Sequence, residues 1–203
     1  ILAGRAGRAT APRGTEPSPM QLSPDLSEWR RAQRAALLAQ RMAIAPSLRS
    51  AWNARITEAL LDALVLDRSV VVAAYWPFKG EFDPRFALRV WRDAGVHTAL
   101  PVVVGKAMPL QFRIWWPGMR TSPGVYGLPI PDEGAIVRPD VVLMPPVGFD
   151  AIGYRLGYGG GYYDRTLAAL SPQPLKIGVA FELSRIETIR PRPHHIPMDY
   201  VVT

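Results

Sequence analysis

Apolar residues recur at helical spacing in two stretches near the start of the chain. Residues 27–45 set Trp29 and Leu37 among arginines, and residues 47–66 repeat the pattern after Pro46. Side chains three and four positions apart lie on one face of a helix, and proline is tolerated in a first turn. We therefore predict two helices separated by a short break.

Later apolar runs have the β-branched composition of strands. Residues 70–75 and 141–144 are continuously apolar, as in strands buried on both faces, whereas residues 110–116 alternate as in a partly exposed strand. A predicted helix over residues 84–94 links the first run to a strand over residues 98–104. Such a βαβ unit requires its two strands to be parallel.

The remaining predicted elements are a helix over residues 162–170 and a strand over residues 176–181. Helices that alternate with buried parallel strands cover both faces of a sheet. The pattern therefore indicates an α/β fold, a three-layer α/β/α sandwich around a mostly parallel sheet, in a single domain over residues 25–203.

Residues 1–24 differ in composition from everything that follows. They are rich in Arg, Pro, Gly and Ala and have neither a helical nor a strand period. A segment of this kind cannot bury enough apolar surface to offset the entropy of ordering. We predict a disordered arm; a targeting segment, a cloning remnant and a misassigned start site all stay open as its origin.

Composition excludes several classes of protein. The 203 residues are 48% apolar, which suits one packed domain, and include no cysteine, which excludes disulfides, zinc ribbons, iron–sulfur clusters and thiol catalysis. No apolar run approaches the roughly 18 residues of a membrane helix. We expect a cytoplasmic protein with no membrane partner. The net charge of +7 could attract nucleic acid, a membrane surface or a small polyanion without choosing between them.

The sequence RLGYGGGYYDR at residues 155–165 joins a predicted strand region to a predicted helix. Glycine backbone beside a helix N-terminus can approach phosphate oxygens and donate N–H groups to them. The pattern is neither a Walker loop nor a dinucleotide fingerprint. A phosphate site is one interpretation, and a turn needed only for chain reversal is the other.

Side chains around this loop favour a site for two substrates. Asp164 falls in the first helical turn, where a carboxylate either caps the helix or joins phosphates in holding Mg²⁺. Tyr158, Tyr162 and Tyr163 are individually compatible with core packing. Three tyrosines around one glycine loop favour a surface that stacks a flat ring.

Three segments together resemble one known family. PPVGFDAIGYRLGYGGGYYDRTL, with YWPFKGEFD upstream and HHIPMDYVVT at the end, is similar to the 5-formyltetrahydrofolate cyclo-ligases over about residues 25–203. The resemblance implies a cytoplasmic α/β/α enzyme that uses ATP and Mg²⁺. Its reaction would convert 5-formyltetrahydrofolate into 5,10-methenyltetrahydrofolate through an imidate phosphate, with release of ADP and phosphate.

The resemblance also implies roles for individual residues. Arg155 and Tyr162 would be catalytic, and Asp164 would hold Mg²⁺. ATP would be bound by two arginines four residues apart in the first helix and by the glycine block, namely Arg30, Arg34, Arg155, Leu156, Gly157, Tyr158, Gly159, Gly160, Gly161, Tyr162 and Tyr163. The folate would contact Trp76, Glu81, Tyr126, Tyr158, Gly159, Gly160, Gly161 and Tyr162. Without the resemblance, the arginines read as a solvated stripe, Glu81 as a loop acid, and Trp76 and Tyr126 as packing residues.

Two positions depart from the family pattern. His195 stands where the family places an acid that helps to hold the metal, and neutral imidazole is a poor ligand for Mg²⁺. Ser184 stands near where a glutamine is common. These departures support an alternative, a divergent nucleotide-binding relative with another substrate or reduced activity. A third hypothesis, a basic nucleic-acid-binding protein, rests on the arginine excess alone.

We expect a small-molecule folate as partner, possibly polyglutamylated, because arginines near the cleft would attract its carboxylates. No specific nucleic acid is expected, and the chain should be a monomer or a weak dimer.

Overall fold

The computed structural model describes residues 24–203. The predicted disordered arm lies outside the described residues except for Pro24, which is the first residue of helix α1. The helices are α1 (Pro24–Met42), α2 (Pro46–Ala63), α3 (Arg85–Asp93) and α4 (Tyr162–Ala169), with 3-10 turns η1 (Val125–Gly127) and η2 (Glu182–Ser184).

A seven-stranded sheet in the order β11-β10-β7-β1-β2-β3-β6 forms the centre of the molecule. The first five strands in this order are parallel, and β3 pairs antiparallel with both β2 and β6. The strands of this sheet are β1 (Val71–Ala73), β2 (His97–Val103), β3 (Leu110–Ile114), β6 (Ile136–Val137), β7 (Val141–Met144), β10 (Leu175–Val179) and β11 (Tyr200–Val202). Two small hairpins pair β4 (Thr121–Pro123) with β5 (Pro129–Pro131) and β8 (Gly148–Phe149) with β9 (Arg155–Leu156).

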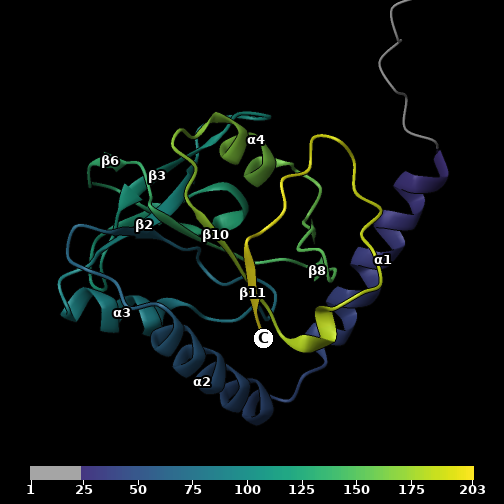
Figure 1. Ribbon diagram of the computed structural model, residues 1–203, viewed down its shortest axis with the longest axis horizontal. Coiled ribbons are helices and arrows are strands. Elements are labelled where there is room, and N and C mark those ends of the chain that lie inside the picture. The colour runs from purple at the N-terminus through teal and green to yellow at the C-terminus, as the bar shows by residue number, and fades with distance from the viewer. Residues whose placement is uncertain (1–23) are drawn as a thin grey trace, which may run out of the picture.

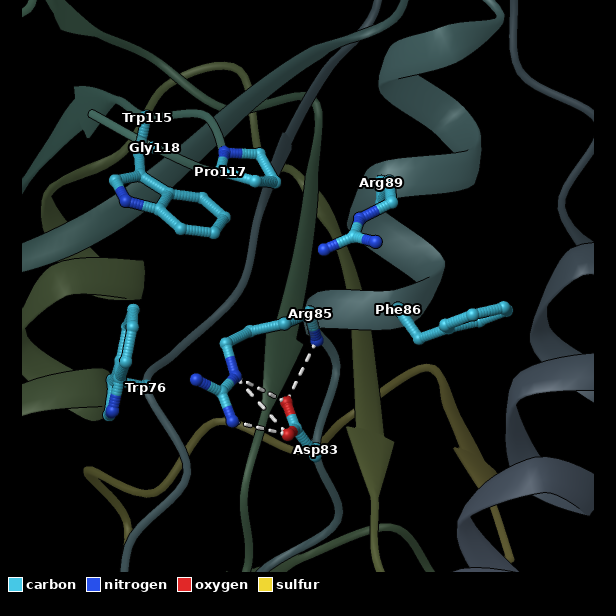
Figure 2. A pocket seen from close by; sticks show the side chains of 8 residues that line it. All are labelled: Trp76, Asp83, Arg85, Phe86, Arg89, Trp115, Pro117 and Gly118. Carbon is cyan, nitrogen blue, oxygen red and sulfur yellow. Dashed lines mark hydrogen bonds and ion pairs between the residues drawn. The ribbon is translucent and has the colours of Figure 1, made fainter.

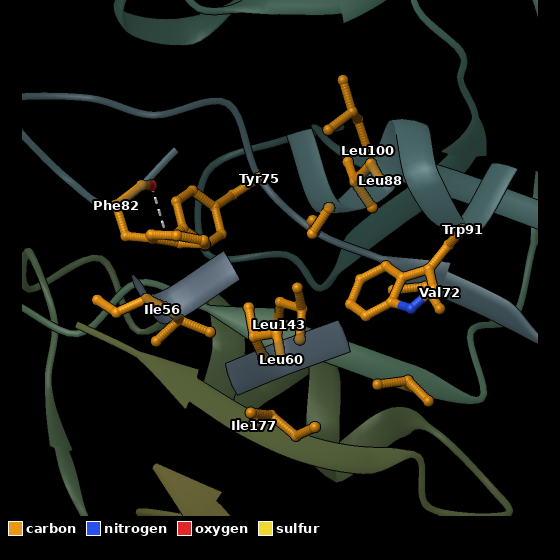
Figure 3. Packing of buried hydrophobic residues seen from close by; sticks show 14 of the residues in the cluster. Ile56, Leu60, Val72, Tyr75, Phe82, Leu88, Trp91, Leu100, Leu143 and Ile177 are labelled. Carbon is orange, nitrogen blue, oxygen red and sulfur yellow. Dashed lines mark hydrogen bonds between the residues drawn. The ribbon is translucent and has the colours of Figure 1, made fainter. Parts of the chain in front are cut away.

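Helices cover both faces of the sheet, which confirms the predicted α/β/α class. Leu60 of α2 and Trp91 of α3 pack with Leu143 of β7 on one face, where Figure 3 shows them in one cluster. Leu167 of α4 packs with Val142 on the other face. Figure 1 shows α2 and α3 together on one side of the sheet, α4 on the opposite side, and α1 alongside β8. The expected single domain has this one sheet as its centre.

The two helical crossovers lead from the centre of the sheet toward opposite edges. From β1 it passes through α3 to β2, and from β7 through α4 to β10, while β1 and β7 are neighbours. Where crossovers diverge in this way, the loops at the carboxyl ends of the two strands open a crevice that commonly holds ligands. These loops are residues 74–84 after β1 and residues 145–161 after β7.

The predicted elements are present; β2 and β7 have the expected lengths, and β1, β3 and β10 are shorter than expected. Strand β1 is three residues long, against a prediction of 70–75; the Ala74 N–H still donates to the Ala99 carbonyl of β2, and a turn follows at residues 79–80. Strand β11 at residues 200–202 was missed; it pairs with β10 at the edge of the sheet. No helix in the described residues is both long and apolar enough to cross a membrane.

Candidate functional site

A buried carboxylate lies in the loop after β1. Glu81 is 5% exposed, and the backbone N–H of Phe78 donates to its Oε2 at 2.9 Å. Tyr158 of the glycine loop donates its hydroxyl proton to Glu81 Oε1 at 2.8 Å. The loops after β1 and β7 are therefore joined by a side-chain hydrogen bond, as their common edge of the sheet leads one to expect.

Arg41 of α1 completes this cluster. Its Nη2 donates to Tyr158 Oη at 2.6 Å and lies 3.7 Å from Glu81 Oε1. Its Nε and Nη1 donate to the carbonyls of Lys79 at 3.0 Å and Pro146 at 3.4 Å. Arg41 is 3% exposed, so this guanidinium ties α1 to both loops. We call Arg41, Glu81 and Tyr158 the buried triad after its two buried charged groups; Tyr158 itself is 43% exposed.

Burial raises the pKa of Glu81 to about 7, against the lowering influence of Arg41, Tyr158 and the Phe78 N–H. Desolvation outweighs the ion pair because Arg41 approaches Glu81 only to 3.7 Å. Burial and the charge of Glu81 also raise the pKa of Tyr158, which keeps its hydroxyl protonated as a donor. The carboxylate thus changes charge near neutral pH while its donors do not.

Aromatic rings line the approach to the buried triad. The ring of Tyr126 stacks on Phe78, with centroids 6.5 Å apart, and Phe78 lies 5.9 Å from Tyr158. Tyr126 has a positive φ of 61° and is 77% exposed, so its ring stands out from the turn between β4 and β5. These rings provide a flat apolar surface beside Glu81. Trp76 instead packs edge-on against Trp115, with centroids 6.0 Å apart.

The glycine loop ends at helix α4. Gly161, with φ of 65°, is the N-cap, and no side chain caps the helix. Gly159 has φ of 98°, and a Cβ there would stand 3.4 Å from Arg34 Nη1. The loop is open to solvent at Gly159 and Gly160. Free helix N–H groups and an arginine at the same loop suit an anion.

Positive charge accumulates beside this loop. Burial, and then the charges of Arg192 and Arg34, lowers the pKa of Arg30, and burial lowers that of Arg34. The Nε atoms of both Arg30 and Arg34 are buried without a hydrogen-bond partner among residues 24–203. Arg30 Nη2 is held by the carbonyls of Ile189, at 3.3 Å, and Arg190. A phosphate would relieve the repulsion between these cations, so the residues fit the phosphates of ATP.

Arg155 and Asp164 form an ion pair, with Nη2 donating to Oδ1 at 2.7 Å. The Ile196 N–H also donates to Asp164 Oδ1, at 3.1 Å, and Arg155 Nη1 donates to the Ile196 carbonyl at 2.7 Å. Oδ2 of Asp164 makes no hydrogen bond with the described residues. No group of three His, Asp or Glu residues between 24 and 203 forms a metal site. The residues therefore fit Mg²⁺ only with one carboxylate oxygen and further ligands from phosphate and water.

His195 has neighbours at both ring nitrogens. Its Nδ1 accepts from the Arg192 N–H at 2.8 Å, and its Nε2 lies 3.4 Å from Arg30 Nη1. Burial lowers the pKa of His195, which favours a neutral ring. Two donors facing one side chain suit a carboxylate better than an imidazole. A role of His195 as a metal ligand beside Asp164 stays a prediction.

The other predicted site residues lie in or beside the loop. Leu156 is 4% exposed in a core cluster with Leu37 of α1. Tyr162 lies at the start of α4 with its ring against Gly160, where a Cβ would stand 2.8 Å from it. Tyr163 packs against the core cluster that contains Val142 and Leu167. The guanidinium of Arg155 lies 5.9 Å from the ring centroid of Tyr163. Contacts of these residues with a ligand stay predictions.

Arg41 was missed in the sequence, although a signal for it existed. Arg30, Arg34, Leu37 and Arg41 are separated by four, three and four residues, which places them on one helix face. A buried leucine within an arginine stripe indicates that the stripe faces the protein. Ser184 is 1% exposed and its hydroxyl has no partner in the described chain. Whether the serine lacks a polar contact that the family's glutamine makes is not tested by this observation.

The sequence and the fold were compared with those of known proteins. The profile of the 5-formyltetrahydrofolate cyclo-ligase family matches residues 26–203. A 5-formyltetrahydrofolate cyclo-ligase from Mycolicibacterium smegmatis is 30% identical over 179 residues, which cover 84% of this chain and 91% of the relative. One from Escherichia coli K12 is 32% identical over 142 residues, which cover 65% and 76%.

Two solved structures have the same fold. The 5,10-methenyltetrahydrofolate synthetase of Mycoplasma pneumoniae superposes with a TM-score of 0.70 at 25% identity, over 85% of this chain and 97% of the other. That of Aquifex aeolicus gives a TM-score of 0.73 at 30% identity, over 85% and 88%. Both the sequence and the fold thus relate this chain to the same group of enzymes.

Proposed function

Because the chain belongs to the 5-formyltetrahydrofolate cyclo-ligase family, we propose that it converts 5-formyltetrahydrofolate into 5,10-methenyltetrahydrofolate, with ATP and Mg²⁺, releasing ADP and phosphate. Membership makes the chain a ligase. The observation that carries the proposal is the hydrogen bond between Tyr158 and Glu81. It joins a phosphate-type loop to a buried acceptor, so that one site can hold two substrates side by side.

Glu81 is the proposed acceptor for the N–H groups of the pterin. A buried carboxylate with fixed donors on one side has defined lone pairs for a ligand on the other. Phe78 and Tyr126 would contact the flat ring system, since they are stacked beside Glu81. Arg41 keeps the carboxylate in place through Tyr158 and through the backbone of both loops.

The nucleotide would lie along the glycine loop and the start of α4. Arg34 faces the loop at Gly159, and Arg30 is fixed nearby by two carbonyls. When bound, ATP supplies the phosphoryl group that makes the formyl oxygen a leaving group, as an imidate phosphate, so that N10 can close the ring. Such chemistry mainly asks a protein for positioning and charge neutralisation.

Arg155 and Asp164 would act together beside the phosphates. Arg155 fixes the carboxylate through Oδ1, which leaves Oδ2 for a phosphate-bound Mg²⁺. The predicted catalytic role of Tyr162 rests on its position at the first residue of α4, with its ring over Gly160.

The direct test mixes purified protein, Mg·ATP and 5-formyltetrahydrofolate and follows the near-ultraviolet absorbance of the methenyl product, with ADP measured in parallel. We expect one ADP per methenyl product. Failure to form product at high enzyme concentration would contradict the proposal.

A divergent relative with altered substrate or reduced activity is a second candidate, supported by His195 and by the Ser184 hydroxyl, which has no hydrogen-bond partner among residues 24–203. His195→Asp restores a carboxylate between the donors of Arg30 and Arg192. A large gain in turnover with 5-formyltetrahydrofolate would favour this candidate, whereas fast turnover by the natural sequence would exclude it.

A cytoplasmic location, a monomeric or weakly dimeric state and acceptance of polyglutamylated folates also belong to the proposal. Gel filtration with light scattering tests the oligomeric state, and assays with longer glutamate tails test the last point.

A further inference from the structure

Asp150 is a buried carboxylate in the turn between β8 and β9 to which the proposed reaction assigns no role. It is 3% exposed and forms no ion pair with any residue between 24 and 203. Asp83, in the loop after β1, is different: Arg85 donates to both of its oxygens, as Figure 2 shows. A buried charge without a cation is costly unless hydrogen bonds satisfy it, so the partners of Asp150 indicate its role.

One oxygen of Asp150 closes the turn that leads into the glycine loop. Its Oδ1 accepts from the N–H groups of Ile152, at 3.2 Å, and Tyr154, at 3.0 Å. The Asp150 N–H donates to the Tyr154 carbonyl at 3.1 Å. Arg155, the first residue of β9 and of the glycine block, follows directly. A turn of this kind needs only one side-chain acceptor, which asparagine also supplies.

The other oxygen contacts a segment far along the chain. Oδ2 of Asp150 accepts from the Ile189 N–H at 3.1 Å. The Ile189 side chain is fully buried in a core cluster with Leu37 of α1, and Figure 1 shows the yellow part of the chain after η2 alongside α1. Only a carboxylate accepts on both sides, because the amide of asparagine presents a donor on one of them.

The segment that Asp150 holds also orients Arg30. Arg30 Nη2 donates to the Ile189 carbonyl at 3.3 Å and to the Arg190 carbonyl. Arg190 has φ of 52°, a strained conformation that persists only where the surrounding structure fixes it. Its N–H donates to Thr188 Oγ1 at 2.9 Å. Both N–H groups of this Ile189–Arg190 pair are thus held while both carbonyls face Arg30.

We propose that Asp150 is a positioning residue that holds Arg30 at a fixed place relative to the glycine loop. The inference rests on the proposed function, in which both bind the phosphates of ATP. The like charges of Arg192 and Arg34 act on Arg30 and lower its pKa, so Arg30 needs a rigid support in the absence of an anion. Asp150 supplies it, because one carboxylate joins the turn before the loop to the segment behind Arg30.

Asp150→Asn tests the proposal, since asparagine accepts on one side only. The substitution removes a negative charge, so charge alone would tighten the binding of an anion, whereas lost positioning weakens it. We expect the Kd for a non-hydrolysable ATP analogue with Mg²⁺, measured by calorimetry on the full chain, to rise roughly tenfold, as for one charged hydrogen bond. The Kd for 5-formyltetrahydrofolate should not change.

A double-mutant cycle tests whether Asp150 acts through Arg30. In an Arg30→Ala background, Asp150→Asn should change the Kd for the analogue by less than about twofold, because the residue that it positions is gone. Additive effects would overturn the proposal. Tighter binding of the analogue by Asp150→Asn would overturn it too, and so would an equal loss of affinity for the folate.

Asp140→Asn is the matched control. Asp140 Oδ2 accepts from the Val71 N–H at 2.9 Å, at the amino ends of β1 and β7, so charge and acceptor are lost away from the loops. We expect no change in the Kd for the analogue, and a rise equal to that of Asp150→Asn would contradict the proposal.

Thr188→Val is the second variant if Asp150→Asn does not fold. It frees the Arg190 N–H without a change of charge, and we expect a few-fold rise in the Kd for the analogue; an unchanged Kd would overturn the proposal. Coupled effects on analogue binding support the positioning role even if no methenyl product forms, in which case only the proposed reaction fails. Absence of analogue binding by the natural chain would overturn both.

Discussion

The two halves of the site differ in how their charges are satisfied. In the buried triad, Glu81 and Arg41 are at most 5% exposed, and three donors from two loops and one helix surround the carboxylate. Beside the glycine loop, Arg30 and Arg34 have buried Nε atoms without partners in the described chain, and the backbone at Gly159 is open. The charged groups of the buried triad thus have protein partners without a ligand, whereas the Nε atoms of Arg30 and Arg34 have none among the described residues.

This difference indicates that the two halves have different roles in ligand binding. A satisfied network holds one geometry and can select a ring by shape and by hydrogen-bond pattern. Neighbouring cations without a counter-ion gain most when an anion binds. We therefore expect substitutions in the buried triad to act on stability and folate binding, and those beside the loop to act on ATP.

Arg41→Ala should have the largest effect. It leaves Glu81 and Tyr158 without their cation and two carbonyls without a donor, so we expect about 3 kcal/mol lower free energy of unfolding, typical of a broken buried pair. Urea denaturation measures this loss. Arg49→Ala, which removes a hydrogen bond from a partly exposed arginine of α2 to the Ile44 carbonyl between α1 and α2, is the control. Equal losses would show that the triad is not a stabilising unit.

Arg34→Ala should weaken ATP binding and leave the free energy of unfolding nearly unchanged, in contrast to Arg41→Ala. The Arg34 side chain lies against the glycine loop, and its Nε makes no hydrogen bond within the described part of the chain. We therefore expect little change in stability and a rise in KM for ATP of roughly 30-fold. Thermal unfolding without ligand and initial rates at varied ATP check both parts. A change confined to the KM for folate would contradict the assignment of this half to ATP.

The pKa of about 7 for Glu81 predicts a pH effect on folate binding. If the carboxylate accepts from the pterin, only about a tenth of the protein is competent at pH 6, so KM for folate should rise roughly tenfold between pH 8 and pH 6. Glu81→Gln should remove this dependence, and a wild-type KM that is flat over the same range would contradict it.

The same group also affects stability. Its folded pKa is raised, so the folded state holds more protons than the unfolded state between the ordinary carboxyl pKa and about 7. Glu81 should therefore contribute less to the free energy of unfolding as pH rises through this window. Glu81→Gln should make the free energy of unfolding depend less on pH over the same range.

Gly159→Ala should give the smallest effect of the four. The φ of 98° is unfavourable for a side chain, and the new Cβ would press on Arg34, so we expect a loss of about 1 kcal/mol and a few-fold higher KM for ATP. Gly157 has no positive φ, and a methyl group there would meet no atom within 4 Å, so Gly157→Ala should not lower stability. Matching losses in both would contradict the role of loop geometry.

The order of apolar and polar residues along the chain predicted the helices and the buried central strands. The continuous apolar runs at residues 70–75 and 141–144 contain β1 and β7, because burial on both faces leaves only apolar residues. Strand β11 was missed because residues 200–202 are short and partly exposed, and their pairing with β10 depends on the completed sheet.

The site shows the same limit. The resemblance to the family pointed to Glu81 and Tyr158, and the structure joins them by a hydrogen bond. Helical spacing places Arg41 on the same face as Arg30 and Arg34, but its contacts with two distant loops, which make it part of the site, could not be read from that spacing. Asp164 was expected at a metal, and its pairing with Arg155 depends on the segment around Ile196, which no local pattern relates to it.

Arg30 is held by carbonyls that lie 159 and 160 residues further along the chain. During synthesis, α1 leaves the ribosome long before the residues that fix this arginine exist. A chain that stops before Ile189 would carry the glycine loop and Arg30 but lack the two carbonyls that hold this arginine in place. We therefore expect the proposed nucleotide site to form only once the chain has been made through Arg190.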